Sequence, residues 1–213
     1  QATHDSTSGL LNWQEWMRQV QDSKRQILEN GQEYHAALLV LNVDYFESLI
    51  HRSKRAGDIA IRKIGSWLLS STRQMECRAK DLILSHFIGD EFVIYAPLTS
   101  LDGANTLADR LRTGFQGLNL GTEKNRFHTS FSIGIVAFDS GISLHYAMSL
   151  ALQACREAKE NGKDRIRVAK NETSVHIKLD SIIRDALHHR RLRLWTQKIV
   201  PVSPAAKAAD RGR

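Results

Sequence analysis

The chain has 213 residues, a length that fits one large domain or one domain plus a fragment. Hydrophobic residues make up 42% and charged residues 25%, which excludes wholesale disorder, collagen and coiled coil. The formal net charge is +7, but residues 1–183 hold 22 Lys and Arg against 21 Asp and Glu, whereas the last thirty residues hold 8 against 2. Because the excess positive charge lies in the terminal stretch, a nucleic-acid partner is not expected.

No apolar run reaches the ~20 residues that span a bilayer, and no signal-peptide pattern opens the chain. We therefore expect a cytoplasmic domain, in a protein that is free to carry a membrane tether upstream. Cys77 and Cys155 are distant in sequence and lack metal-ligand spacing, which predicts reduced thiols with a packing role.

The first predicted elements are a helix, a buried strand and a second helix. Apolar residues recur at helical spacing from Leu10 to about Glu33, with Asp5 and Ser6 as candidate caps. Residues 34–43 are dense in Ala, Leu and Val, which is typical of a strand buried on both faces. Helical spacing returns over residues 59–69 and predicts a helix of roughly four turns.

A tight hairpin follows. Residues 82–87 and 92–96 have strand patterns and are separated only by Ile88-Gly89-Asp90-Glu91. The remaining elements are expected in the order helix 101–115, strand 127–138, helix 143–161 closed by Gly162, and a short strand 165–168. The alternation predicts an α/β domain, and the hairpin means that its sheet is not purely parallel.

A change of composition at Lys170-Asn171-Glu172 predicts a domain boundary. We expect a first domain over residues 1–170 and a separate segment over residues 171–202, made of a linker helix and one strand. The final residues, 203–213, are low in complexity, which predicts a disordered tail.

Polar side chains stand at two of the predicted strand ends. Asn42 and Asp44 are two residues apart and share one face of a strand, and Asp90 and Glu91 lie in the hairpin. If the hairpin lies beside the first strand, these groups form an oxygen-rich pocket of the kind that suits Mg²⁺ and phosphoryl transfer. Acids at turns are also often simply solvated, so the pattern alone leaves both interpretations open.

Six short motifs stand in one order along the chain: Asp5-Ser6-Thr7-Ser8-Gly9-Leu10-Leu11-Asn12, Asn42-Val43-Asp44-Tyr45-Phe46, Ala56-Gly57-Asp58, Ile88-Gly89-Asp90-Glu91-Phe92, Ser132-Ile133-Gly134-Ile135 and Ala158-Lys159-Glu160-Asn161-Gly162-Lys163. This series resembles the GGDEF domains, the diguanylate cyclases that join two GTP molecules into cyclic di-GMP. The resemblance implies the palm-like fold of nucleotide cyclases, with a central mixed, largely antiparallel sheet of about five strands flanked by helices.

A second resemblance covers residues 179–202. Arg184, Leu192-Arg193-Leu194 and Gln197-Lys198-Ile199-Val200 are similar to the first helix and strand of an EAL domain, the cyclic di-GMP phosphodiesterase family. The Glu-Ala-Leu motif itself is absent from these residues. The two resemblances together imply a cyclase-like domain from a longer tandem protein with an attached EAL domain.

The resemblance to GGDEF domains implies where a metal and the catalytic groups belong. The metal ligands fall on Asn42, the Val43 carbonyl, Asp90 and Glu91, and the last two are also the catalytic acids of the signature. Because an amide oxygen carries no charge, Asn42 predicts weakened Mg²⁺ affinity.

The same resemblance places nucleotide contacts on Gly89, Asp58, Lys159 and Lys163, where Asp58 reads guanine and the lysines contact phosphate. From the residues alone, Asp58 is equally a candidate helix N-cap. The lysines are equally a favourable pair of cations near a helix C-terminus.

Three further positions depart from the family pattern. Ile88 replaces the first signature glycine, and a β-branched side chain resists positive φ and fills space beside phosphate. Ile50 replaces an Asn that reads guanine, which leaves polar edges unpaired at a cost of about 1–3 kcal/mol. Glu47 replaces a lysine and brings negative charge toward the triphosphate. With Asn42, these departures predict a degenerate cyclase site.

Arg78 and Asp81 have the RxxD spacing of the family's product-inhibition site, although an i, i+3 surface ion pair is an equal interpretation. Three functions therefore stay open. The leading hypothesis is a regulatory or dimerisation module with weak GTP binding, attached to a phosphodiesterase. The alternatives are a working cyclase whose two copies meet face to face, and a cyclic di-GMP receptor that uses the RxxD pair.

Overall fold

The computed structural model describes residues 3–51, 53–73, 81–121 and 125–169, all within one compact unit, Gln1–Asn171. The predicted elements and tail of residues 171–213 lie outside the described residues, as does Cys77. The elements follow in the order α1 (Trp13–Glu29), β1 (His35–Val43), α2 (Phe46–Ile50), α3 (Lys54–Arg73), β2 (Ile83–Ile88), β3 (Glu91–Pro97), α4 (Leu101–Phe115), β4 (Phe131–Asp139), α5 (Leu144–Glu160) and β5 (Ile166–Val168).

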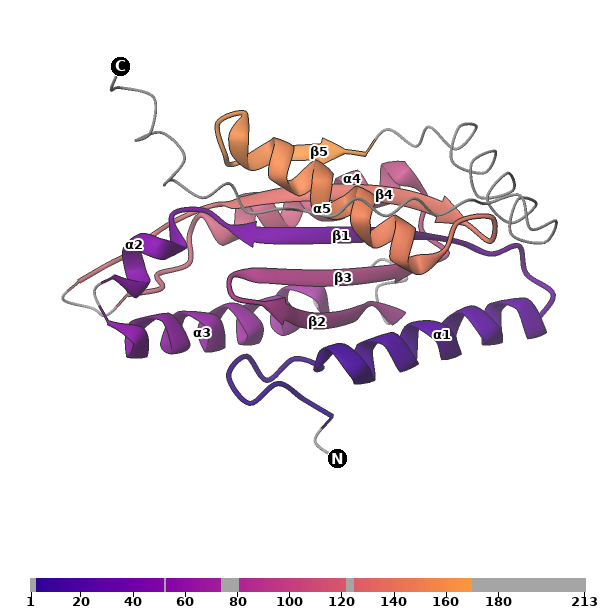
Figure 1. Ribbon diagram of the computed structural model, residues 1–213, viewed down its shortest axis with the longest axis horizontal. Helices are drawn as coiled ribbons and strands as arrows, with labels where there is room; N and C mark the ends of the chain where they lie inside the picture. Colours follow the sequence, from indigo (N-terminus) through magenta and orange to yellow (C-terminus); the bar gives the residue numbers. More distant parts are fainter. Residues whose placement is uncertain (1–2, 52, 74–80, 122–124, 170–213) are drawn as a thin grey trace, which may run out of the picture. The chain divides into compact units, whose positions relative to one another are not determined.

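Five strands form one sheet in the order β2-β3-β1-β4-β5 (Figure 1). The pairings of β2 with β3, β3 with β1 and β1 with β4 are antiparallel, whereas β4 and β5 run parallel. A tight turn suffices between the antiparallel strands β2 and β3, while the parallel pair is joined through the crossover helix α5. The predicted mixed, largely antiparallel sheet flanked by helices is therefore confirmed.

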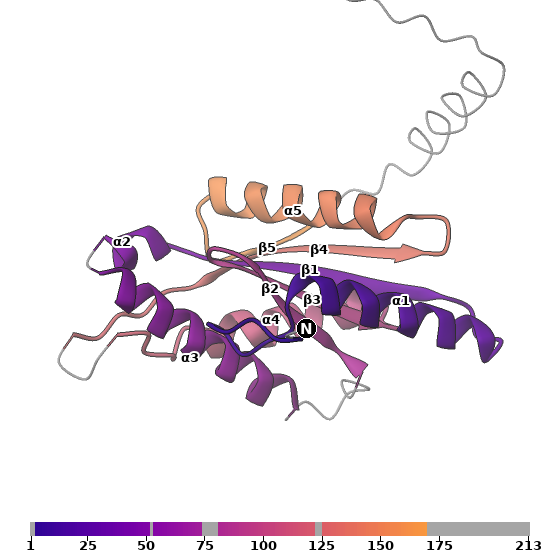
Figure 2. The ribbon, with the colours of Figure 1, turned by 60° about the horizontal axis from the view of Figure 1, so that its bottom comes forward.

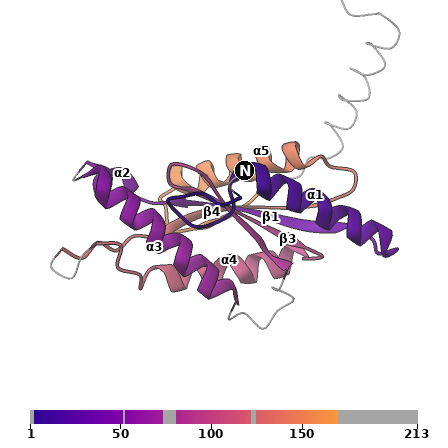
Figure 3. The same ribbon diagram turned by 90° about the horizontal axis from the view of Figure 1, so that it is seen from below.

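Helices cover both faces of the sheet (Figures 2 and 3). Buried side chains of α3 and α4 pack on one face, and those of α1 and α5 pack on the other. β1 lies between the two layers: Leu39 and Leu41 belong to the first cluster, and Leu38 and Val40 belong to the second. Successive side chains of a strand point to opposite faces, so the uninterrupted apolar run of β1 is what burial on both faces requires.

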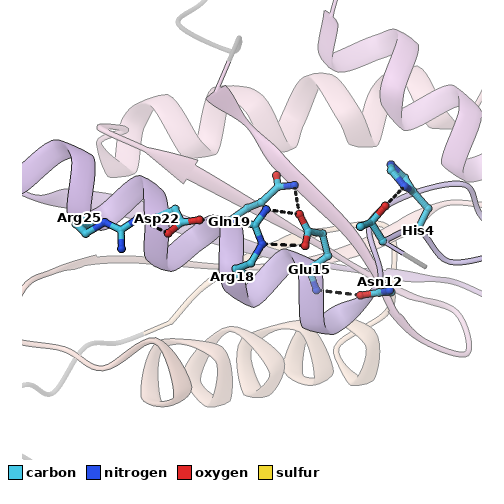
Figure 4. Close-up of polar contacts among 8 residues, drawn as sticks. His4, Asn12, Glu15, Arg18, Gln19, Asp22 and Arg25 are labelled. Carbon is cyan, nitrogen blue, oxygen red and sulfur yellow. Dashed lines mark hydrogen bonds and ion pairs between the residues drawn. The ribbon is translucent and has the colours of Figure 1, made fainter. Parts of the chain in front are cut away.

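Polar contacts define the start and the exposed face of α1 (Figure 4). The side-chain oxygen of Asn12 accepts a hydrogen bond from the N–H of Glu15 at 2.9 Å and caps the helix, so the prediction of Asp5 or Ser6 as the cap is wrong. Arg18 then bridges Glu15 at 2.6 Å and Asp22 at 2.7 Å. Hydrogen bonding to Arg18 lowers the pKa of Glu15 to about 2.

Left-handed backbone sets two helix boundaries that hydrophobic periodicity does not reveal. α1 ends at Glu29 rather than at Glu33, because Gly31 adopts φ +70°. The sequence pattern also does not predict the short helix α2, which follows Tyr45 at φ +57°.

Two further boundaries correct the predictions. α3 begins at Lys54, so Asp58 lies in its second turn and does not cap the helix. β4 begins at Phe131 rather than at residue 127, because the N–H of Phe127 donates to the side-chain oxygen of Asn119 at 3.0 Å and holds this segment in a loop.

α5 packs directly on the backbone of β4. A Cβ added at Gly134 would lie 2.1 Å from the carbonyl oxygen of Ala151, so only glycine permits this approach. The helix closes as predicted at Gly162, which has φ +118°, and the N–H of Lys163 donates back to the carbonyl of Ala158 at 3.2 Å. This close packing fixes where the last turn of α5 projects.

Candidate nucleotide and metal site

Several motifs meet at one end of the sheet. Figure 1 shows the end of β1, the β2–β3 turn, α2 and the C-terminal end of α5 at that end. The register places Asn42 opposite Glu91 on β3 and opposite Ser132 on β4. The hairpin thus lies beside β1, which is the arrangement on which the predicted pocket depends.

The signature turn holds Asp90 against β1. Ile88 pairs with Glu91, which leaves Gly89 and Asp90 as a two-residue loop. Gly89 adopts φ +59°, the conformation that such hairpin loops require at their first position. The carbonyl of Asp90 accepts a hydrogen bond from the N–H of Val43 at 3.1 Å.

Ile88 corrects one expectation about the signature. Ile88 lies in β2, and the left-handed φ falls on Gly89 instead, so the predicted conformational strain of a β-branched residue is absent. The Ile88 side chain is 65% exposed and therefore adds apolar bulk to the solvent face of the turn. Glu47, in α2, is also exposed.

Lys159 joins the two groups of predicted site residues. It lies in the last turn of α5, and its Nζ donates to Asn42 Oδ1 at 2.6 Å and lies 3.5 Å from Asp90 Oδ2. Asn42 is only 7% exposed, and its Nδ2 donates to Glu91 Oε1 at 3.4 Å. The amide therefore links the ammonium of Lys159 to a carboxylate of the signature.

The electrostatic environment opposes ionisation of Glu91. Burial raises its pKa, and the negative charge of Asp90 adds to the effect. The hydrogen bond from Asn42 and the positive charge of Lys159 act in the opposite direction, but the net result is a raised pKa. Glu91 is thus a carboxylate with an increased tendency to hold a proton.

Asp44 does not join this pocket through its side chain, although it lies on the same strand as Asn42. Its buried carboxylate accepts hydrogen bonds from Ser130 Oγ at 2.5 Å, from Ser132 Oγ at 2.7 Å and from the N–H of Asp164 at 3.0 Å. The prediction that Asp44 contributes to the oxygen-rich pocket is therefore wrong. Asp44 instead ties β1 to the start of β4 and to the turn after α5.

The remaining predicted nucleotide contacts lie around α2 and the turn after α5. Lys163 lies beyond the end of α5, and its Nζ is 4.6 Å from the ring centroid of Tyr45. Asp58 is exposed on α3. Ile50 lies beside the same helix, because a Cβ added at Gly57 would be 3.3 Å from Ile50 Cγ1.

His86 is a connection that the sequence reasoning missed. Its Nδ1 lies 3.0 Å from Asp5 Oδ1, and its Nε2 lies 3.0 Å from the carbonyl oxygen of Gly89. The ring also stacks on Phe92. The sequence signal that could have revealed this connection is a histidine within a predicted strand, two residues before the signature. His86 thus joins the first motif of the chain to the signature turn.

The RxxD pair is only partly visible, because Arg78 lies outside the described residues. Asp81 is exposed and borders a hollow of about 410 Å³. The other residues that line this hollow come from α1, the chain after α1, β2 and the end of β3. None of them is another predicted site residue. Inhibition through RxxD therefore stays a prediction.

The donor set at Asn42 does not fit a divalent cation as it stands. Among the described residues, no three His, Cys, Asp or Glu side chains gather as a metal site. Asp90 and Glu91 supply two carboxylates, but the Asn42 oxygen accepts from Lys159 and its N–H faces Glu91. Mg²⁺ prefers oxygen ligands without competing donors.

Comparison with known families agrees with this geometry. The family model described as diguanylate cyclase, GGDEF domain, matches residues 2–165. The sheet, the signature turn and this match together define the class, and the chain belongs to the GGDEF family. No described helix has both the length and the apolar character needed to cross a membrane.

Related proteins share the domain but are longer. Diguanylate cyclase A of Treponema denticola is 24% identical over 137 residues, covering 63% of this chain and 35% of the relative. Diguanylate cyclase DgcM of Escherichia coli K12 is 28% identical over 170 residues, covering 79% of this chain and 38% of the relative. The chain therefore spans little more than a third of these two relatives.

Among solved structures, the GGDEF domain of DgcB from Caulobacter crescentus in complex with c-di-GMP has a TM-score of 0.66 and 21% identity. The match covers 79% of this chain and 96% of the DgcB chain. At this level of identity the likeness shows the fold, and the function has to be inferred from the site.

Proposed function

We propose that this chain is a GGDEF domain with little or no cyclase activity, which regulates an attached cyclic di-GMP phosphodiesterase domain. The observation that carries the proposal is the hydrogen bond from Lys159 Nζ to Asn42 Oδ1 at 2.6 Å. An uncharged amide, already engaged by an ammonium, occupies the position where the family resemblance implies a metal-binding acid.

Other departures act on different parts of the same reaction. Ile88 adds apolar bulk beside the phosphate-binding turn, Ile50 cannot pair with guanine, and Glu47 adds negative charge. If each change costs about 1–3 kcal/mol, even partial additivity amounts to several orders of magnitude, because about 1.4 kcal/mol is a factor of ten in rate.

Weak nucleotide binding is part of the proposal. Asp58 and Gly89 are exposed, and Lys159 and Lys163 are only partly buried, so all four remain accessible. The solved DgcB domain holds c-di-GMP, which supports a guanine nucleotide as the class of ligand. Attachment to an EAL domain rests on the resemblance of residues 179–202.

The test is a purified chain incubated with GTP and Mg²⁺, with cyclic di-GMP measured by chromatography. We expect no more product than from Glu91→Ala. Turnover near the usual enzymatic range of about 1 s⁻¹ or more, abolished by Glu91→Ala, would refute the proposal. A parallel GTP titration with and without Mg²⁺ measures the residual binding.

One observation favours a second candidate, a working cyclase with a variant signature. Both signature acids are present, and burial raises the pKa of Glu91, which suits a group that accepts a proton from an attacking hydroxyl. This function also requires two copies to meet face to face. Light scattering with GTP present would show whether a homodimer forms.

A further inference from the structure

The ammonium of Lys159 stands among the groups expected to hold a metal. Its Nζ is 2.6 Å from Asn42 Oδ1 and 3.5 Å from Asp90 Oδ2. The Lys159 side chain is 37% exposed and that of Asp90 24%, so this contact is partly shielded from solvent. A flexible side chain is held here by two separate oxygen acceptors.

The charges of the cluster are already partly balanced. Asp90 and Glu91 carry two negative charges when ionised, and Lys159 supplies one positive charge. A divalent ion bound here would add two further positive charges next to this ammonium, at a separation where Coulomb repulsion is strong. It would also have to displace the ammonium from Asn42 Oδ1.

The orientation of Asn42 adds a second obstacle. With Oδ1 directed at Lys159, Nδ2 points toward Glu91 Oε1 at 3.4 Å. Turning the amide would expose Oδ1 to a metal, but it would place the two N–H donors of Asn42 against the ammonium and leave the lysine without this acceptor. The amide is therefore well matched to an ammonium and poorly matched to a divalent ion.

We propose that Lys159 is the resident cation of this pocket and that, with Asn42, it replaces a divalent metal ion. The pair acts as one unit: the neutral amide keeps the ammonium in place, and the ammonium neutralises Asp90 without a metal. Each of the two residues therefore opposes the binding of a divalent cation, so Lys159→Met alone should raise the metal affinity in part, and the full gain requires that both residues are changed. This inference concerns metal affinity and does not depend on the proposed loss of cyclase activity.

The test measures Mn²⁺ binding to the full chain, without nucleotide, by electron paramagnetic resonance of free Mn²⁺. Wild type is expected to bind only weakly. Asn42→Asp alone restores an acid but strengthens its attraction to Lys159, so little gain is expected. Asn42→Asp combined with Lys159→Met leaves three carboxylates and no ammonium, and should bind Mn²⁺ about tenfold or more tightly than wild type.

Lys163→Met is the matched control. It removes the same charge four residues further along the chain, but its ammonium contacts the Tyr45 ring. We expect this variant to change the Mn²⁺ affinity by less than about twofold. Equal gains from both lysine variants would indicate only a general loss of positive charge and would overturn the proposal.

Other outcomes decide the matter equally. Tight Mn²⁺ binding by wild type contradicts a resident ammonium, and an additive double variant contradicts a coupled pair. If the double variant does not fold, the Mn²⁺ affinity of Lys159→Met alone tests the proposal. An affinity equal to that of wild type would mean that the ammonium does not exclude the metal. Cyclic di-GMP synthesis by wild type would refute the proposed function, whereas this inference is decided by the Mn²⁺ affinities measured without nucleotide.

Discussion

Asn42 and Asp44 stand two residues apart at the end of the same strand, but their side chains have different partners. Asn42 contacts Lys159 and Glu91, whereas Asp44 is wholly buried and accepts hydrogen bonds from Ser130, Ser132 and a backbone N–H. Sequence spacing predicts that both share a face. It cannot tell which side chain faces the pocket and which is buried against the residues at the start of β4. That distinction depends on contacts with distant residues.

Asp44→Asn is expected to lower the free energy of unfolding by about 1–3 kcal/mol, because one acceptor becomes an N–H donor that faces hydroxyl and amide donors. Urea denaturation followed by circular dichroism measures the change. Asp58→Asn, on the exposed face of α3, is the control and should change stability by no more than about 0.5 kcal/mol. Equal effects would show that the Asp44 hydrogen bonds add nothing.

Glu91→Gln is expected to stabilise the fold at pH 7. Burial raises the pKa of Glu91 in the folded state, so the folded state binds more protons than the unfolded state between the two pKa values. Stability is then lost as pH rises above the unfolded value of about 4.3. The gain from Glu91→Gln should therefore be largest at pH 7 and vanish below pH ~4. Thermal melts at both pH values test this, and a gain independent of pH would contradict it.

Elements are anchored to one another by a few contacts that bring distant motifs together. His86 joins the turn before α1 to the signature turn through Asp5 and Gly89. Gly134 lets α5 rest on β4, and the last turn of α5 then carries Lys159 to Asn42. The position of the pocket therefore depends on element packing as well as on its own side chains.

The contact of Asp5 predicts a pH-dependent anchor. Burial acts to raise the pKa of Asp5, but hydrogen bonds from Ser8 and His86 outweigh it and lower the pKa. The stabilisation is thus present above the unfolded pKa of about 3.9 and is lost as pH falls through the lower folded value. Asp5→Asn should cost about 1 kcal/mol at neutral pH and progressively less below pH ~4. An undiminished cost at pH 3 would contradict this.

Gly134→Ala is expected to destabilise the domain by about 1–3 kcal/mol or more, because the new Cβ would meet the Ala151 carbonyl at 2.1 Å. The shift of α5 should also disturb Asn42, seen as changed amide resonances. Gly117→Ala is the control, since its Cβ would meet only an ordinary contact at 3.7 Å. Similar destabilisation by both substitutions would indicate that close packing of α5 is not the cause.

At the scale of the whole molecule, the sequence predicts the sheet and its layers well and the pocket only in part. The apolar run of β1, the hairpin loop and Gly162 are local signals, and the structure agrees with them. The contacts of Asp44 and His86 join residues far apart in the chain. Such contacts arise from packing, so single-sequence patterns do not contain them.

The compact unit Gln1–Asn171 has its own two-sided core. A chain that ends at Asn171 is therefore expected to unfold in a single transition. Its Tm should lie within about 2–4 °C of the Tm of the full chain, which corresponds to a difference of less than ~1 kcal/mol in the free energy of unfolding. Differential scanning calorimetry makes the comparison. A much lower Tm would show that residues 172–213 contribute to the stability of this unit.

The strand order has a consequence for biosynthesis. β1 occupies the middle of the sheet, although both of its neighbours, β3 and β4, come later in the chain. At a translation rate of about 5–20 residues per second, the nascent β1 waits on the order of ten seconds for β4, and until then the strand edge that pairs with β4 is uncovered. Chaperone capture and aggregation during synthesis should therefore concentrate on residues 35–43.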